Sequence, residues 1–90
     1  MSVYIVSYDI EDNKSRTKLF EELKDLGLLN IQKSVFYGEL SKSEIKVVKE
    51  LFKKLCDDGD KAFLCRCEID LDYTHGYKKA DLEQLSFDSI

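Results

Sequence analysis

Acidic and basic side chains gather just after the first strongly apolar segment of the chain. Asp9 is a carboxylate at the end of a run of apolar and aromatic residues, and Asp12 follows in the next turn. Three cations come just beyond it, Lys14, Arg16 and Lys18. Carboxylate oxygens are ligands that Mg²⁺ accepts, and a helix N-terminus with cations beside it favours phosphate. This mixture suits a divalent metal bound to a phosphodiester.

The same residues also have a structural interpretation. An aspartate that ends a strand often forms a turn or caps a helix, and the cations of a helix often lie on its solvated face. One carboxylate is a sparse ligand set, although Mg²⁺ keeps several waters and takes only one or two protein carboxylates. Two copies of Asp9 related by a dimer axis would be enough to hold a metal between them. Spacing alone cannot decide between the two interpretations.

The segment that ends near Asp9 has the pattern of a strand. Over residues 3–10, one face carries apolar and aromatic side chains at every second position, Tyr4, Val6, Tyr8 and Ile10. The other face begins apolar at Val3 and Ile5 and becomes polar at Ser7 and Asp9. A strand that is apolar on both faces is central in its sheet, and its second face must also be covered. In a chain of 90 residues, a second subunit can provide that cover.

A helix and an extended stretch follow this strand. Leucines recur at helical spacing over about residues 14–26, Asp12 or Asn13 can cap the helix, and Gly27 is a natural stop. Residues 29–40 are extended in character, and they form either one bent strand or two short ones.

A second helix and a last strand complete the pattern. Ser41 and Glu44 form a capping box before an apolar stripe, and the helix ends in the turn at residues 57–60. Residues 61–70 alternate again as a last core strand, in which Phe63 is assigned to a core face. This order predicts an α+β fold, a ferredoxin-like sandwich of one antiparallel sheet with both helices on one face. Two helices cover only one face, which favours a two-fold dimer.

One domain is expected over residues 1–90, with its core in about residues 1–70. Residues 71–90 mix aromatic and acidic side chains without a strong period, so we expect a C-terminal segment at a dimer or partner interface. Three tyrosines are expected to be free to contact a partner, Tyr37, Tyr73 and Tyr77.

Charge is divided unevenly along the chain. Residues 1–54 carry 10 Lys or Arg and 9 Asp or Glu, whereas residues 55–90 carry 4 and 9. The first part can present a local basic surface, and the acidic end is a solvated or partner-directed segment. No apolar run approaches the roughly 20 residues of a membrane span, and the first ten residues lack a secretory pattern. We therefore expect a cytoplasmic protein that does not engage a membrane.

The cysteines offer a weaker candidate site. Cys56, Cys65, Cys67 and His75 could be assembled into a zinc site, but structural zinc usually draws on cysteine pairs of wider spacing. An odd number of cysteines without framework spacing favours reduced, buried thiols. The chain also has no glycine-rich phosphate loop, serine elbow or Cys-His nucleophile pattern, so nucleoside triphosphate hydrolysis and acyl transfer have no support.

Two segments carry a family resemblance. The runs YIVSYDIED at residues 4–12, with Arg16 and Lys18 after it, and IQKSVFYG at residues 31–38 resemble the signature segments of a CRISPR-associated adaptation protein family. This family is the second of the two core adaptation proteins, the small nuclease-like partner of the integrase in spacer acquisition. The resemblance covers about residues 3–69 in order and spacing.

The resemblance implies a ferredoxin-like protomer and a homodimer joined through its sheet faces. It places a divalent-metal site, for Mg²⁺ or Mn²⁺, between two copies of Asp9, which is then both the catalytic and the metal-binding residue. It also implies a phosphate contact for Arg16, and we expect nucleic-acid contacts from Lys14 and Lys18 beside it.

Three further residues match motif positions of the family and are expected to support the site. Phe36 is a packing or gate residue, and Tyr8 and Ser34 have less specific roles.

The resemblance implies a metal-dependent endonuclease on single-stranded RNA or double-stranded DNA, and a central piece of the integration complex. Our first hypothesis is a dimeric subunit that bridges integrase subunits, lies along prespacer DNA through backbone contacts and hydrolyses phosphodiesters. Two alternatives stay open: a non-catalytic structural bridge in which Asp9 only shapes a turn, and a toxin-like ribonuclease on the same fold.

Overall fold

The computed structural model describes residues 2–82 and has the element order that the sequence predicts. A strand, β1 (Ser2–Asp9), leads into helix α1 (Asn13–Asp25). Two short strands, β2 (Leu29–Gln32) and β3 (Val35–Leu40), come next, so the extended stretch is two strands rather than one. Helix α2 (Lys42–Leu55), strand β4 (Lys61–Arg66) and a 3-10 turn, η1 (Leu71–Tyr73), come next, and residues 79–82, the last that are described, are helical.

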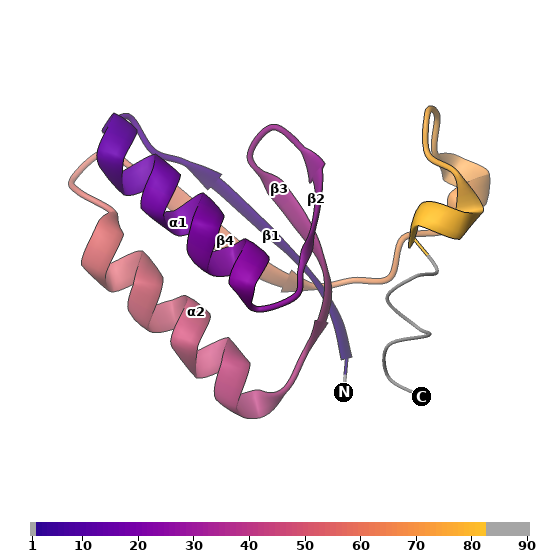
Figure 1. Cartoon of the computed structure of the whole chain (residues 1–90), viewed down its shortest axis with the longest axis horizontal. Helices are drawn as coiled ribbons and strands as arrows, with labels where there is room; N and C mark the ends of the chain where they lie inside the picture. Colours follow the sequence, from indigo (N-terminus) through magenta and orange to yellow (C-terminus); the bar gives the residue numbers. More distant parts are fainter. Residues whose placement is uncertain (1, 83–90) are drawn as a thin grey trace.

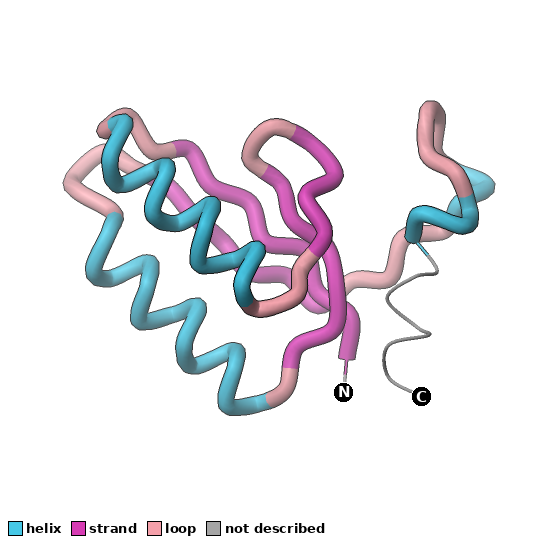
Figure 2. The backbone as a smooth tube through the Cα atoms, viewed as in Figure 1, coloured by secondary structure: helices cyan, strands magenta, loops and turns pink. Residues whose placement is uncertain are grey.

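The four strands form one sheet in the order β2-β3-β1-β4, and every pair is antiparallel. Both helices lie on the same face of this sheet, side by side (Figure 1). The smooth backbone trace shows the same two layers (Figure 2). The predicted ferredoxin-like α+β fold is thus confirmed. We call the sheet face away from α1 and α2 the open face.

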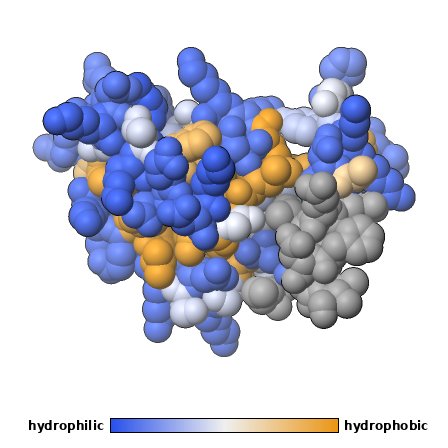
Figure 3. Space-filling view, in the orientation of Figure 1, coloured by the Kyte–Doolittle hydropathy of each residue, from blue (hydrophilic) through white to orange (hydrophobic). Residues whose placement is uncertain are grey.

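The hydrophobic core fills the space between the sheet and the helices. Alternate residues of β1, Val6 and Tyr8, are at most 5% exposed, as the period of two predicts. Phe36 of β3 is fully buried, with its ring centroid 6.4 Å from that of Tyr8 and 5.1 Å from that of Phe20. Polar side chains cover most of the helix side of the molecule, and hydrophobic ones show in patches near its middle (Figure 3).

Side-chain caps fix where both helices begin. The Asp12 carboxylate accepts a hydrogen bond from the Ser15 amide at 2.8 Å, which selects Asp12 over Asn13 as the cap of α1. The predicted capping box of α2 is present, with Glu44 N–H donating to Ser41 Oγ and Ser41 N–H donating to Glu44 Oε1. Helix α1 stops before Gly27, whose φ of +89° is open to glycine at little cost.

The assignment of Phe63 to the core was wrong. Strand β4 lies at the edge of the sheet, and it is Ala62 and Leu64 that pack against the core. Phe63 points to the open face and is 55% exposed. The strand also ends at Arg66, four residues earlier than expected.

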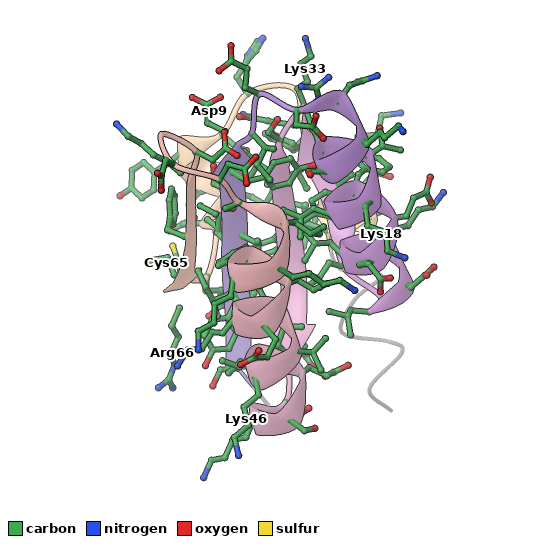
Figure 4. The ribbon with its side chains drawn as sticks, turned by 90° about the vertical axis from the view of Figure 1, so that its left-hand side faces the viewer. Asp9, Lys18, Lys33, Lys46, Cys65 and Arg66 are labelled. Atoms are coloured by element: carbon green, nitrogen blue, oxygen red, sulfur yellow. The ribbon has the colours of Figure 1, made fainter. Side chains whose placement is uncertain are left out.

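The expectation of buried thiols was also wrong for two of the three cysteines. Cys65 and Cys67 are exposed, and only Cys56 is half-buried. Cys65 lies on β4 (Figure 4). Within residues 2–82, no group of three or more His, Cys, Asp or Glu side chains is arranged to hold a metal, so no zinc site is formed there.

The stretch after β4 packs back on the protomer's own β2–β3 hairpin. Ile69 N–H donates to the Tyr37 hydroxyl at 3.0 Å, and the Tyr77 hydroxyl donates to the Ile31 carbonyl at 3.1 Å. Tyr37 and Tyr77 are therefore not free, contrary to expectation, whereas Tyr73 is 88% exposed. Residues 83–90 of the predicted interface segment lie outside the described residues.

No helix within residues 2–82 combines the length and the hydropathy that crossing a bilayer requires.

Candidate nucleic-acid and metal site

Asp9 ends β1 on the open face. Its neighbours Tyr8 and Ile10 are buried on the helix side, so the pleat of the strand turns the Asp9 side chain the other way. Across the ladder Asp9 faces Lys61 of β4, and it is exposed. Among residues 2–82 its carboxylate has neither a hydrogen bond nor an ion pair. It stands at one end of the sheet with its oxygens outward (Figure 4).

Other acids perform the structural tasks that the sequence left open for Asp9. Asp12 caps α1, as described above. Asp60 accepts hydrogen bonds from Glu11 N–H at 3.1 Å and from Asp57 N–H at 2.9 Å, and so ties the β1–α1 turn to the turn before β4. The interpretation in which Asp9 caps a helix or shapes a turn has no contact to support it in the described chain.

The cap also changes the chemistry of Asp12. The Ser15 amide that donates to its carboxylate lowers the pKa of Asp12 below its usual value, with a smaller contribution from Lys14. Because its Oδ2 accepts the hydrogen bond that caps the helix, Asp12 is a poorer candidate for a metal ligand than Asp9. Asp9 is left as the aspartate at the end of β1 whose carboxylate has no structural contact within residues 2–82.

Arg16 is engaged with the backbone of this turn. Its Nη1 donates to the Ile10 carbonyl at 3.0 Å and to the Glu11 carbonyl at 3.2 Å, and its Nη2 donates to Asn13 Oδ1 at 2.5 Å. These bonds hold together the residues that connect β1 to α1. The predicted phosphate contact would have to use the guanidinium N–H groups that do not take part in these bonds.

The two lysines of α1 differ in their surroundings. Lys18 Nζ pairs with Glu22 Oε1 at 2.8 Å, one turn further along the helix, and this pair raises the pKa of Lys18. Its side chain lies along α1, well away from Asp9 (Figure 4). Lys14 is exposed in the first turn, beside the Asp12 carboxylate. Of the two, Lys14 is the better placed for a phosphate near the β1–α1 turn.

A cation that the sequence analysis did not select also lies at this end. Lys33 forms the β2–β3 turn with Ser34, and it stands at the same end of the molecule as Asp9 (Figure 4). The backbone fixes this position, because Tyr8 N–H donates to the Ser34 carbonyl at 3.1 Å. Splitting residues 29–40 at Lys33-Ser34 would have placed the turn, and the lysine, beside the end of β1.

Of the supporting residues, Tyr8 and Phe36 belong to the core and Ser34 to this turn. The structure thus brings Asp9, Lys14, Lys33 and Ser34 to one end of the sheet and leaves Lys18 outside the group. This is the arrangement of a small acidic centre flanked by cations, which suits a phosphodiester.

Comparison with known proteins identifies the family. The family model described as CRISPR associated protein Cas2 matches residues 1–70. The chain belongs to the Cas2 family. A curated relative from Francisella tularensis subsp. novicida, named CRISPR-associated endoribonuclease Cas2 1, is 44% identical over 77 residues, which are 82% of this chain and 79% of the relative.

Solved structures agree with the Cas2 assignment. A hypothetical protein from Thermus thermophilus, TT1823, superposes with a TM-score of 0.70 at 28% identity, over 82% of this chain and 90% of that one. A structure described as cas2 gives a TM-score of 0.69 at 27% identity, over 88% and 91%. The family resemblance inferred from the two sequence motifs is therefore confirmed.

Proposed function

We propose that this Cas2-family chain is a metal-dependent endoribonuclease whose hydrolytic site forms between two copies. The observation that carries the proposal is the exposed, unpartnered Asp9 carboxylate at the end of the open face. The 44% identical relative is named an endoribonuclease, which makes RNA the first substrate to test.

The open face itself supports a second copy as its cover. Its β1 positions Val3, Ile5 and Ser7 are uncharged, and Phe63 of β4 leaves 55% of its surface exposed there. The exposed Phe63 ring is unfavourable in water, so we expect this part of the open face to lie against another surface. Packing two such faces about a two-fold axis would bring symmetry-related Asp9 side chains into one site.

A pair of Asp9 carboxylates fits a hard divalent cation. Mg²⁺ accepts one or two carboxylates and completes its shell with water and substrate oxygens, and Mn²⁺ accepts similar ligands. When bound, such a cation would lower the pKa of a coordinated water and offset charge on the phosphoryl oxygens. The protein's own contribution is to hold the cation through Asp9 and to position the strand through Lys14 and Lys33.

The test of hydrolysis is Asp9→Asn, which keeps the side-chain size and removes the charge. Cleavage of a single-stranded RNA oligomer by the purified variant in Mg²⁺ should fall at least about 100-fold, because the variant would lose the ligand of the cation that offsets transition-state charge. Asp58→Asn, an exposed acid in the α2–β4 turn, is the matched control and should cleave normally. Equal cleavage by wild type and Asp9→Asn would contradict the proposal, and a duplex DNA substrate assayed in parallel distinguishes RNA from DNA specificity.

The test of assembly places a charge on each face of the fold. Phe63→Asp puts a carboxylate on the open face, within the proposed interface, and should shift the particle from dimer to monomer in sedimentation at micromolar concentration. Val47→Asp, at a position that is 43% exposed on α2, is the control on the helix side and should leave the dimer intact. A wild-type chain that sediments as a monomer at tens of micromolar would refute the shared site.

Membership of the Cas2 family also supports a role in spacer acquisition, as a dimer that bridges subunits of the CRISPR integrase and contacts prespacer DNA through its backbone. Asp9→Asn separates this role from hydrolysis. A bridging role predicts that the variant still co-elutes with the integrase subunit, whereas loss of co-elution would tie the carboxylate to assembly.

A further inference from the structure

A small cavity lies on the helix side of the sheet, behind the end of β1 that carries Asp9. Its volume is about 200 Å³, and its walls come from β1, α1 and the β2–β3 turn: Tyr8, Arg16, Thr17, Phe20, Lys33 and Ser34. This is below the roughly 300–1,000 Å³ of sites that hold drug-sized ligands. The occupant must therefore be a fragment of about the size of one base.

The Tyr8 hydroxyl is the most informative group in the cavity wall. Tyr8 is only 5% exposed, yet its Oη makes no hydrogen bond with residues 2–82. Every side-chain polar atom of the described residues that is sealed from solvent has a hydrogen-bond partner. The Tyr8 hydroxyl has none, so it must reach solvent, and it does so through the cavity. Burial raises the pKa of Tyr8 against the opposing influence of Arg16, so the group is a neutral donor.

The rest of the lining determines which ligand chemistry fits. Thr17 and Ser34 contribute two more hydroxyls, and the lining contains no carboxylate. Hydroxyls both donate and accept, which matches the edge of a nucleobase, where donors and acceptors stand side by side. Phe20, whose ring is only partly buried, offers an aromatic surface of the kind on which bases pack.

The cavity and Asp9 are adjacent along the chain. Tyr8 and Asp9 are consecutive residues that point to opposite faces of β1, so a strand crossing this end of the sheet passes both. Lys33 at the mouth of the cavity can neutralise the intervening phosphate. Resting on the nuclease function above, we propose that this cavity receives one unpaired base of the RNA strand, next to the linkage that Asp9 faces. Unstacked bases of this kind are available in single-stranded RNA and absent from an intact duplex.

Tyr8→Phe tests the proposal, because it removes only the hydroxyl and keeps the ring that packs against Phe36. Binding is measured by fluorescence anisotropy in EDTA, where hydrolysis cannot proceed. Two labelled probes of equal length are compared: a uridylate RNA, and the same strand with abasic residues at its internal positions. Tyr8→Phe should weaken binding of the uridylate strand about three- to ten-fold, the range for one hydrogen bond, and leave the abasic strand unchanged.

Two further variants complete the design. Ser34→Ala removes a second hydroxyl of the cavity wall and should also weaken binding of the uridylate strand. It leaves the backbone bond from Tyr8 N–H to the Ser34 carbonyl in place, so the turn should keep its position. Tyr4→Phe makes the same chemical change in β1 but outside the cavity lining, and it should bind both probes as wild type does.

Every outcome of the comparison is decisive. An equal loss on both probes would assign the cavity to the phosphate backbone and overturn the proposal, as would no loss on either. The proposed hydrolysis is tested separately. If wild type bound the uridylate strand more tightly than the abasic strand but did not cleave RNA in Mg²⁺, the base cavity would be supported and the nuclease function refuted.

Discussion

Replacing Arg16 separates two roles that the family motif cannot distinguish, contact with phosphate and support of the β1–α1 turn. The Nη1 bond to the Ile10 carbonyl is partly buried, whereas the bonds to Glu11 and Asn13 are exposed. A partly buried bond from a charged donor contributes about 1.5 kcal/mol, and exposed polar pairs add about 0.5 kcal/mol together. Arg16→Ala should therefore lower the free energy of unfolding by about 2 kcal/mol, or Tm by roughly 8–16 °C for a domain of this size.

Arg16→Lys gives the decisive comparison. It keeps the positive charge that a phosphate needs, but a single ammonium cannot span two carbonyls and a side-chain amide as a guanidinium does. We expect it to lose about 1 kcal/mol or more while the salt dependence of RNA binding stays as in wild type. Urea unfolding followed by circular dichroism, at two protein concentrations because a dimer is expected, measures the first quantity.

The control for these variants is Arg66→Ala. Arg66 is exposed at the end of β4 and has no side-chain hydrogen bond or ion pair to residues 2–82, so its replacement should change stability by less than about 0.5 kcal/mol. If Arg16→Lys were as stable as wild type, or Arg16→Ala no more costly than Arg66→Ala, the turn-supporting role would be refuted.

Two further predictions concern the fold. Val48→Ala should cost about 2 kcal/mol in urea unfolding because Val48 is fully buried, whereas Val47→Ala, next to it and 43% exposed, should cost under about 0.5 kcal/mol; equal costs would contradict the packing of α2. The lowered pKa of Asp12 means that its cap stabilises the fold above pH about 4, near its usual pKa of 3.8, and is lost as pH falls further. The difference in Tm between wild type and Asp12→Asn should therefore disappear between about pH 5 and pH 2, the range in which this carboxylate becomes protonated. A difference in Tm that stays constant with pH would show that the charge at the cap is irrelevant.

Alternation along β1 was sufficient to predict how the site is presented. In a central strand every second side chain enters the core, so burial of Tyr8 and Ile10 fixes the outward direction of Asp9 without any other information. The capping box at Ser41 and Glu44 was equally local and equally reliable. Signals of this type need only neighbouring residues.

Prediction failed where the pattern depends on partners in space. Strand β2 has an irregularity between Asn30 and Gln32, which breaks the alternation that would have separated β2 from β3, and Lys33 was overlooked with it. Strand β4 is apolar on both faces, so its sequence could not show that Ala62 faces the core and Phe63 does not. The bonds of Arg16 to backbone carbonyls leave no trace in composition or spacing.

The free carboxylate of Asp9 is easier to explain in a pair than in a single protomer. Asp12 and Asp60 each accept hydrogen bonds from backbone N–H groups of the adjoining turns and so stabilise the fold. Asp9 has no such contact among the described residues. At the rim of an apolar face it would oppose the approach of an identical carboxylate from a second copy. In the proposed dimer, a divalent cation between the two would remove that repulsion and turn it into attraction. Asp9 would then weaken the proposed interface in the absence of metal and couple assembly of the dimer to metal binding.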